Sequence, residues 1–596
     1  MEIIMQLRTL FCSALLCPLA FAASQGQSRS VATTPASEIP HLRKQGTATQ
    51  LIVDGKPFPV LAAELTNNSA TSVEYMKPVW SKLVEAKVNT ALAGVAWNRI
   101  EPQEGKFDFS NLDGVIRDAR SHNLRLVLLW FASWKNGLSS YPPDWLKKDF
   151  ERFPRAQIVG DNTPWPAIAM SDGERIQVTG RRTIELLSTF SDANRDADAR
   201  AFAALMRHVK EVDGQQHTVI MIQLENEVGM QGDSRDRSPA ADKAFAGPVP
   251  QELMDYLQKH KDSLIPEFRQ VWAAAGFKAS GTWEEVFGKG TATDEIFTCW
   301  YFARYLGRVA EAGKAEYPVP IYMNAALGRT STIADAIGKA HEPGGMYFAV
   351  GGPMPDLMDV WRAGAPRIDM LSPDAYDDRD FVSWCAKYSR SGNPLFIPEN
   401  LGGPEGAARV LYMFGHDAVG WTVMGIEDPI FTHPDNDLIS SYDVITQLTP
   451  LIGEHQGKGT MSAVLLRPND PPQKVQVGNY TLTVAFLNSR RITGALPSQG
   501  PPPPAAAIFI ATGPDEYFVA GSDVTVTFSP STPGPPLAGL ATVEEGSFVN
   551  GRWVPGRVLN GDDSDEGACL VLRRSGCCWS PTSAKGIQRV TLYRYR

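Results

Sequence analysis

The stretch QLENEVG, residues 223–229, places polar chemistry at the end of an apolar run. Residues 218–224, TVIMIQL, are mostly apolar or β-branched, which is typical of a strand buried on both faces. Glu225, Asn226 and Glu227 lie at or just past the end of this run. A carboxyl group can act as an acid, a base or a nucleophile, and an amide can hydrogen-bond a hydroxyl group. Carboxyl groups at such a position must be paired, solvated or used on a substrate.

Further carboxyl, amide and aromatic side chains lie at the ends of other apolar runs. Glu399 comes directly after NPLFIP at 393–398, and Glu64 lies in PVLAAEL at 59–65. Aromatic rings can cover the apolar face of a sugar and leave its hydroxyl groups free. This set of side chains therefore predicts a site for an oligosaccharide. The other candidates at run ends are Trp97, Asn98, Trp134, Asn324, Asp374, Tyr376, Asn400, Trp421, Glu427 and Asp428.

Eight apolar runs alternate with helical patterns between residues 50 and about 430. Strands that alternate with helices indicate βαβ units and a parallel sheet. Eight such units predict an α/β fold of the (β/α)8 type, a TIM barrel. A doubly wound sheet is the main alternative, but no Gly-x-Gly-x-x-Gly turn follows the first run. The runs are 59–65, 88–95, 124–131, 218–224, 319–324, 367–372, 393–398 and 418–424.

The order of the runs predicts where two of the glutamates lie relative to each other in the barrel. Barrel active sites gather at the C-terminal ends of the strands. Glu227 follows the fourth run and Glu399 the seventh, so we expect them on opposite sides of the ring. Glycoside hydrolysis needs two carboxyl groups that flank one bond. Taken alone, a glutamate at a strand end is more often a helix cap or an ion-pair partner, and a tryptophan there is more often core packing.

The composition of the chain changes near its two ends. Residues 1–22 have Arg8, an apolar run and Ala20-Phe21-Ala22, which is typical of a cleaved secretory signal peptide. Lipidation at Cys17 is the weaker alternative. We expect residues 23–49 to form a flexible N-terminus and residues 50–450 the catalytic barrel. In residues 455–596, apolar and polar residues alternate in runs rich in Val, Thr, Tyr and Phe, and Pro-rich loops separate these runs. We therefore expect a smaller all-β sandwich domain there.

Charge and cysteine content narrow the classes of partner. The net charge of −9, without a long basic run, argues against nucleic acid. We find no internal span of the roughly 20 apolar residues that a bilayer crossing needs. Neither a His-Glu-x-x-His motif nor a Cys/His ligand spacing is present, so we expect no metal and no cofactor. Export permits a disulfide between Cys569 and Cys577 or Cys578, although buried free thiols fit the sequence equally well.

These motifs give the chain a family resemblance. QLENEVG is similar to the Gln-x-Glu-Asn-Glu-x-Gly pattern of glycoside hydrolase family 35, the β-galactosidases. AKVNTALAGVAWNRIEPQEGKFDFSN and LRLVLLWFASWKNGLSSYPPDWL resemble the second and third barrel segments of that family. The resemblance covers residues 55 to 430. The C-terminal part resembles the β-sandwich of a bacterial branch that is also similar to family 42.

The resemblance implies a role for each matched residue. Glu227 would be the acid/base, Glu399 the nucleophile, and Asn226 the partner of the sugar 2-hydroxyl. Tyr376 would hold the nucleophile, and Glu225 would point away into an ion pair. We further expect Glu64, Trp97, Asn98, Trp134 and Trp421 to bind the substrate. In two places this chain departs from the family, because Gly94 replaces a tyrosine and Ser133 replaces the glutamate of Ala-Glu-Trp.

The expected activity is therefore that of an exported retaining exo-β-galactosidase, periplasmic or secreted. Its carboxyl groups would lie roughly 5 to 5.5 Å apart. Glu227 would keep a raised pKa, most simply because of the Glu399 charge. Xyloglucan-derived oligosaccharides as substrate, and a homodimer as assembly, are implied by the resemblance alone. The alternatives are a β-glucosidase, a β-xylosidase, a family 42 enzyme, or a non-catalytic carbohydrate-binding protein.

Overall fold

The computed structural model describes residues 38–158, 186–327, 331–339, 349–376, 380–427, 437–487, 502–559, 561–573 and 586–596. Residues Glu38–Arg596 form one compact unit. The expected signal peptide at 1–22, the segment 23–37, Asp428, Cys577 and Cys578 lie outside the described residues. Export and the disulfide therefore stay predictions.

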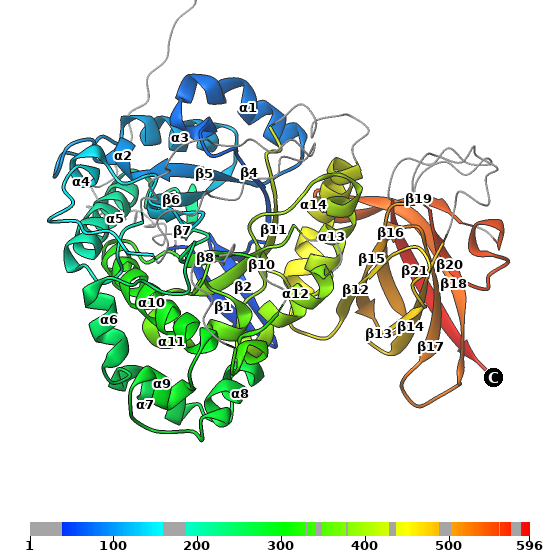
Figure 1. The fold of residues 1–596 in the computed structure, drawn as a ribbon. Helices are drawn as coiled ribbons and strands as arrows, with labels where there is room; N and C mark the ends of the chain where they lie inside the picture. The colour runs from blue at the N-terminus through cyan, green and yellow to red at the C-terminus, as the bar shows by residue number, and fades with distance from the viewer. Residues whose placement is uncertain are drawn as a thin grey trace, which may run out of the picture. The chain divides into compact units, whose positions relative to one another are not determined.

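Eight parallel strands form a nearly closed ring, which Figure 1 shows with the surrounding helices. Their order is β10-β11-β4-β5-β6-β7-β8-β9, and a parallel bridge between Asp374 and Glu399 joins the ends of β9 and β10. All eight predicted strands are confirmed, and the TIM barrel is correct rather than the doubly wound sheet. The strands are β4 (Val60–Glu64), β5 (Thr90–Ala96), β6 (Arg125–Lys135), β7 (Val219–Asn226), β8 (Ile321–Ala326), β9 (Met370–Asp374), β10 (Phe396–Ile397) and β11 (Gly420–Met424).

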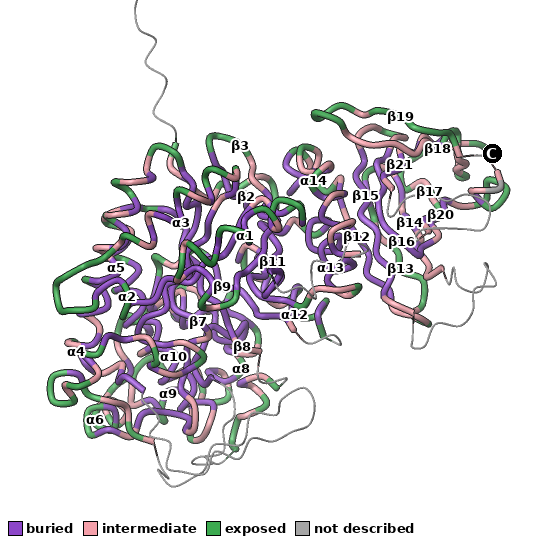
Figure 2. The backbone as a smooth tube through the Cα atoms, turned by 90° about the horizontal axis from the view of Figure 1, so that it is seen from above, coloured by how far each residue is buried: buried purple, intermediate pink, exposed green. Residues whose placement is uncertain are grey.

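Helices surround the ring and cover the outward-facing side chains of the strands. The strands are buried along most of their length, while the helices expose one face (Figure 2). Inside the ring, Leu92, Leu129, Phe131, Tyr322 and Phe396 belong to a separate apolar cluster. The helices are α1 (Val73–Glu85), α2 (Trp97–Ile100), α3 (Ser110–Ser121), α4 (Asp144–Lys147), α5 (Asp192–Asp213), α6 (Pro239–Ala246), α7 (Gln251–Lys259), α8 (Pro266–Ala274), α9 (Trp283–Phe287), α10 (Thr291–Glu316), α11 (Met358–Gly364), α12 (Phe381–Tyr388), α13 (Gly403–Gly415) and α14 (Asp437–His455).

The segment before the barrel differs from expectation. Residues 41–49 are not a flexible tail, because they form β1 (His41–Gln45) and the start of β2 (Ala48–Val53). These strands and β3 (Lys56–Pro57) make a small antiparallel sheet. The Thr47 N–H donates to the Gly457 carbonyl at 3.2 Å, and Gln50 Nε2 donates to the Gly453 carbonyl at 2.7 Å. Bonds to the end of α14 thus order this hairpin.

The C-terminal part is a β-sandwich, as predicted. A six-stranded and a four-stranded sheet enclose their own apolar core, which includes Val464, Phe509, Val519 and Val590. The opposite face of the larger sheet, with Ile508 and Ile510, joins the main core around the barrel. The strands are β12 (Met461–Leu466), β15 (Ala505–Gly513), β16 (Glu516–Ser522), β21 (Ile587–Tyr595), β18 (Leu537–Val549) and β19 (Arg552–Val558), then β13 (Gln473–Val477), β14 (Tyr480–Phe486), β17 (Val524–Pro530) and β20 (Leu570–Leu572).

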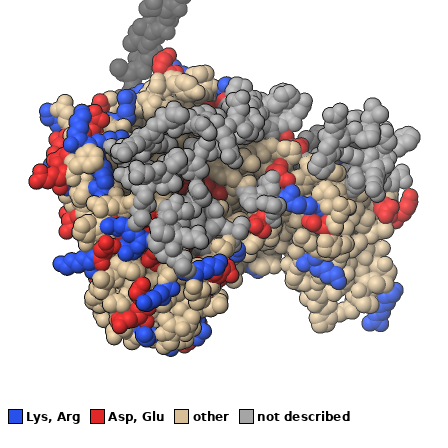
Figure 3. Space-filling model, in the orientation of Figure 1, with Lys and Arg blue, Asp and Glu red and all other residues tan. Residues whose placement is uncertain are grey.

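The described surface carries charges of both signs. On the face shown in Figure 3, acidic and basic side chains are interspersed over the described residues. Within the described ranges, no helix is long and apolar enough to cross a bilayer. The same ranges contain no cluster of three or more His, Cys, Asp or Glu side chains that could hold a metal ion.

Candidate active site

The backbone at the end of β7 explains why the Glu225 and Glu227 side chains point in different directions. Both residues adopt left-handed backbone angles, with φ of 57° and 46°. Such angles are uncommon for residues other than glycine, and they interrupt the regular alternation of a strand. Glu225 turns outward between β6 and β7, whereas Asn226 and Glu227 turn toward the carboxyl group of Glu399. The strained backbone therefore separates two glutamates that simple alternation would place on one face.

The Glu399 carboxyl group is held by three donors. Asn226 Nδ2 donates to Glu399 Oε1 at 3.0 Å, and Asn324 Nδ2 donates to the same oxygen at 3.2 Å. The Tyr376 hydroxyl donates to Glu399 Oε2 at 2.8 Å. Burial and the Glu399 charge raise the pKa of Tyr376, so this hydroxyl keeps its proton. These three hydrogen bonds thus fix the orientation of the Glu399 carboxyl group.

The Glu227 carboxyl group is in a different environment. Its backbone N–H donates to Asn324 Oδ1 at 2.9 Å, and its side chain is close enough to the Asp374 carboxyl group for the two to affect each other's pKa. Burial raises the pKa of Glu227 to about 7, and the negative charge of Glu399 adds to the effect. The expected raised pKa is confirmed, but burial is its main cause and the Glu399 charge comes second. A carboxyl group with this pKa can hold and release a proton near neutral pH.

More carboxyl groups surround this pair than two roles require. Glu64, at the end of β4, is 1% exposed, and its Oε2 has no hydrogen-bond partner among the described residues. Burial and then the charge of Glu399 raise the pKa of Glu64 well above its ordinary value. Asp374 accepts a hydrogen bond from Asn324 Nδ2 at 2.7 Å, and burial likewise raises its pKa. Glu427 instead accepts from the Thr66 N–H and the Ser69 hydroxyl.

The expected ion pair of Glu225 is wrong, because its carboxyl group binds backbone N–H groups instead of a cation. Its carboxyl group accepts the backbone N–H groups of Ala132, Ser133 and Trp134 at 3.0, 2.9 and 2.9 Å. It is also hydrogen-bonded to the Asp198 carboxyl group. Burial and then the Asp198 charge raise the pKa of Glu225 well above its ordinary value. Glu225 is thus a buried structural residue that holds the end of β6.

Lys135 is a site residue that the sequence did not predict. Lys135 Nζ donates to Asn226 Oδ1 at 2.6 Å and to Asn136 Oδ1 at 3.0 Å, and it lies 4.7 Å from the ring centroid of Phe131. Its charge lowers the pKa values of Glu64 and Glu227. A search for cations as well as acids and amides at strand ends would have found it.

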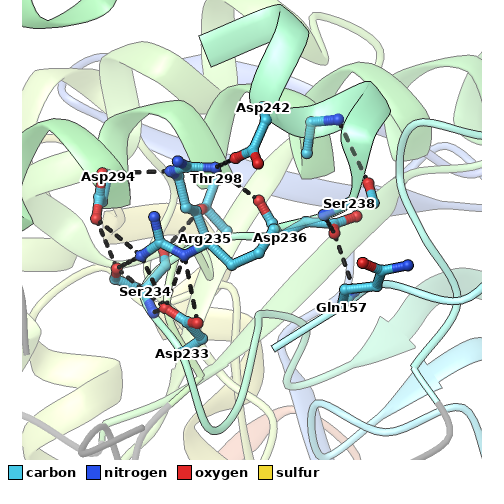
Figure 4. A network of polar contacts seen from close by, with 11 residues as sticks. Gln157, Asp233, Ser234, Arg235, Asp236, Ser238, Asp242, Asp294 and Thr298 are labelled. Carbon is cyan, nitrogen blue, oxygen red and sulfur yellow. Dashed lines mark hydrogen bonds and ion pairs between the residues drawn. The ribbon is translucent and has the colours of Figure 1, made fainter. Parts of the chain in front are cut away.

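The loop after Glu227 is tied down by a buried polar network (Figure 4). Arg237 Nη2 contacts Asp233 Oδ1 at 2.9 Å, and the Ser234 hydroxyl donates to Asp294 Oδ2 on α10 at 2.7 Å. Arg235 Nη1 contacts Asp242 Oδ1 on α6 at 2.6 Å. The loop that carries the acid/base candidate is therefore anchored to two helices.

The three predicted tryptophan platforms are wrong, because each indole is buried in the core. Trp97 donates to Glu101 Oε2 at 2.7 Å and contacts the Trp130 and Trp145 rings. Trp134 packs edge-on against Phe302 and Tyr305 of α10, and Trp421 lies edge-on to Phe381 of α12. All three are 0% exposed. A tryptophan at a strand end can face either the ring or the helices, and sequence does not fix which.

Asn98 is exposed, and it lines a surface cavity whose walls do not include Glu227 or Glu399. The structure therefore does not bring Asn98 to the carboxyl pair. Asn324 and Asp374, which sequence placed at strand ends without a role, do reach the pair. Asn400 is buried, and its Oδ1 accepts from Arg409 Nη1 at 3.0 Å.

The two departures from the family pattern have structural explanations. A Cβ atom at Gly94 would lie 2.9 Å from the Phe131 ring and 2.9 Å from the Asn67 carbonyl oxygen. Phe131 therefore leaves no room for a side chain at position 94. The Ser133 hydroxyl points away from the ring and hydrogen-bonds Tyr305 of α10 at 2.9 Å and Asp198 at 2.5 Å.

Residues 72–287 match a family model described as beta-galactosidase. This model is that of glycoside hydrolase family 42, and its match includes Glu227 but ends before Glu399. Residues 438–570 match a second model, described as a domain of unknown function (DUF5597). The barrel segment 72–287 is thus similar to glycoside hydrolases of the β-galactosidase type.

Individual relatives match over part of the chain. A β-galactosidase of Xanthomonas manihotis is 33% identical over 124 residues, which is 20% of this chain and 20% of the relative. The β-galactosidase structure from Bacillus circulans sp. alkalophilus has a TM-score of 0.41 at 14% identity and covers 67% of this chain and 57% of its own. A β-amylase catalytic domain from Paenibacillus polymyxa has a TM-score of 0.40 at 13% identity and covers 65% and 97%. The chain spans little more than half of the β-galactosidase structure and a fifth of the sequence relative.

Proposed function

We propose that this protein is a retaining glycoside hydrolase that removes terminal β-linked galactose from oligosaccharides. The observation that carries the proposal is the contrast between two neighbouring carboxyl groups. Glu399 accepts hydrogen bonds from three side chains, whereas burial raises the pKa of Glu227 to about 7. Two carboxyl groups whose environments differ in this way can divide the roles of nucleophile and acid.

The reaction follows from these roles. A carboxylate oxygen of Glu399 attacks the anomeric carbon while Glu227 gives its proton to the departing glycosidic oxygen. The carbon–oxygen bond to the leaving group breaks, and an ester between the sugar and Glu399 forms. Glu227, now a carboxylate, takes a proton from water, and the resulting hydroxide displaces Glu399. Two inversions at one carbon retain the β configuration.

Other groups of the ring are suited to hold the sugar. The Glu64 carboxyl group is buried, and it is close enough to Glu399 and Glu227 to feel their charges. Its Oε2 lacks a partner among the described residues, so a sugar hydroxyl would satisfy it. Asn226 uses one amide N–H on Glu399, and the second can meet the 2-hydroxyl. The galactose preference rests on the family 35 resemblance and on the family model matched by residues 72–287.

Two residues give a structural reason to consider a different sugar as the substrate of the same reaction. Gly94 and Ser133 stand where family 35 has galactose-binding side chains, and neither offers a comparable group to the ring. A β-glucosidase or a β-xylosidase with the same carboxyl pair is therefore the alternative proposal. Export by the segment 1–22 and action on xyloglucan-derived oligosaccharides complete the proposal. Export rests on the signal-peptide pattern of residues 1–22, and the xyloglucan substrate rests on the family resemblance.

The test is a rate comparison on nitrophenyl glycosides. We expect the wild-type protein to hydrolyse the β-galactoside faster than the β-glucoside, the β-xyloside or the α-galactoside. Glu399→Gln keeps the shape and removes the attacking charge, so kcat should fall by about 10⁴-fold or more without a loss of Tm. A faster β-glucoside or β-xyloside would correct the sugar, and Glu399→Gln with more than a tenth of wild-type kcat would end the proposal.

A further inference from the structure

The amide of Asn226 is held at both of its ends. A lysine ammonium has donors only, so the atom of Asn226 that faces Lys135 Nζ at 2.6 Å must be the amide oxygen. The nitrogen end then faces Glu399 Oε1 at 3.0 Å, where only a donor is favourable. A flipped amide would set its N–H groups against the ammonium and its oxygen against the carboxylate. Lys135 therefore fixes the direction in which Asn226 presents its donors.

Lys135 reaches Asn226 because β6 carries extra residues at its end. Trp130 pairs with Leu224 and Lys135 pairs with Asn226, and the register shifts between these two pairs. From the first pair to the second, β6 advances by five residues and β7 by only two, so β6 bulges here. The backbone N–H groups of this bulge would lack partners in the ladder, and the Glu225 carboxyl group accepts three of them.

The adjacent residues Glu225 and Asn226 are thus both involved in the contact with Lys135. The Glu225 carboxyl group binds the backbone of the bulge, and the bulge places Lys135 beside Asn226. Lys135 then orients the amide of Asn226, the residue that directly follows Glu225. The Lys135 ammonium lies over the ring of Phe131, and this ring also excludes a side chain at position 94. A β-bulge that re-aims a side chain beside a candidate active site is a common structural device.

We propose that Lys135 is a positioning residue of this site, which locks the Asn226 amide onto the nucleophile and onto the sugar 2-hydroxyl. The inference rests on the proposed glycoside hydrolysis and adds to it the residue that makes the 2-hydroxyl contact effective. Bonds to the 2-hydroxyl strengthen in the transition state of such reactions. Loss of Lys135 should therefore lower kcat and not only raise KM.

A second consequence is electrostatic. The charged and titratable side chains around Glu227 are Glu399, Lys135, Asp374 and Glu64, and Lys135 is the cation among them. Its positive charge favours the ionised acid/base and so lowers the pKa of Glu227. The acid must be protonated for the first step, so activity falls as pH rises through this pKa. Removal of the ammonium should move that fall to higher pH.

The test compares Lys135→Met with Lys135→Arg, and uses exposed Lys148→Met as the matched control. Each variant is assayed on the best aryl glycoside and on its 2-deoxy analogue across pH. We expect Lys135→Met to lower kcat on the 2-hydroxy substrate by about 100-fold, to lower it far less on the analogue, and to move the high-pH limb upward. Lys135→Arg should restore the position of that limb, and Lys148→Met should leave every readout unchanged.

The outcomes separate this inference from the proposed function. An equal loss on both substrates, or an unmoved high-pH limb, would overturn the role of Lys135. If the wild-type protein hydrolyses no glycoside, the proposed function fails first, and the contact is then tested by thermal unfolding. The Tm losses of Lys135→Met and Asn226→Ala should not add in the double variant, because both remove one contact. Additive losses would mean that the two side chains act independently.

Discussion

At the scale of single residues, the carboxyl groups of the site differ in the number and kind of hydrogen-bond donors that contact them. Glu399 accepts three hydrogen bonds, Glu225 accepts three backbone N–H groups, and Glu64 Oε2 accepts none among the described residues. Hydrogen bonds fix the orientation of a carboxyl group, and burial raises the pKa values of Glu64, Glu225 and Glu227. Identical side chains therefore acquire different chemistry from their surroundings.

The raised pKa of Glu227 has a consequence for stability. Its folded pKa of about 7 lies above the ordinary value of 4.5, so the folded state binds more protons between these two pH values. The contribution of this group to the free energy of unfolding is fully present below the ordinary pKa and is lost as pH rises through the folded one. We expect wild type to lose about 3 kcal/mol relative to Glu227→Gln over this window. Urea unfolding at several pH values measures the difference, and a pH-independent difference would contradict the assignment.

The sequence indicated which positions bring carboxyl, amide and hydroxyl groups to the candidate site. It did not indicate in which direction the tryptophan side chains point. Glu227, Glu399, Asn226 and Tyr376 come together because parallel strands end at one rim. The indoles of Trp97, Trp134 and Trp421 turn toward the helices instead, and a continuous apolar run does not show which of its side chains face the ring and which face the helices. Lys135 was missed because only acids, amides and rings were sought at strand ends, and its contact with Asn226 depends on a bulge in β6 that the apolar run does not indicate.

At the scale of elements, the loop after β7 connects the acid/base to rigid helices. Met230 forms an antiparallel bridge with Val350, and the polar network of Figure 4 holds the residues that follow. The bridge requires Gly229, whose φ is 144° and whose added Cβ would lie 2.6 Å from the Ala349 carbonyl carbon. The apolar runs that predicted the eight strands say nothing of such loop contacts, because these depend on residues distant in sequence.

Gly229→Ala should therefore disturb the loop and Glu227 together. We expect a loss of about 2 kcal/mol in the free energy of unfolding from backbone strain and collision, together with a lower kcat. Gly276→Ala is the control, because Gly276 also has a positive φ, of 81°, but an added Cβ meets nothing within 4 Å. Equal effects of the two substitutions would show that the close approach to Ala349 has no role.

At the scale of the whole molecule, the sandwich and the barrel share apolar packing. Ile508 and Ile510 of β15 belong to the main core that surrounds the barrel, while Phe509 and Val519 belong to the sandwich core. Composition alone predicted two domains, and it could not predict this shared packing, because both faces of β15 are equally apolar in sequence. Continuous burial of this kind favours unfolding in a single transition.

This shared core leads to a calorimetric prediction. Ile508→Ala should cost about 3 kcal/mol and lower one common Tm. Val519→Ala should shift the same single transition, although Val519 belongs to the sandwich core and not to the main core. Two separate transitions, of which the barrel transition stays unmoved in both variants, would mean that the parts unfold independently.

The central claim is that Glu227 gives and takes the proton while Glu399 holds the sugar, and azide rescue tests it most directly. In Glu227→Ala, a dinitrophenyl β-galactoside should still form the intermediate on Glu399, because its leaving group needs little protonation. Azide needs no general base, so it should restore turnover and give the β-galactosyl azide with retained configuration. Rescue in Glu225→Ala instead of Glu227→Ala, or formation of the α-azide, would contradict the account.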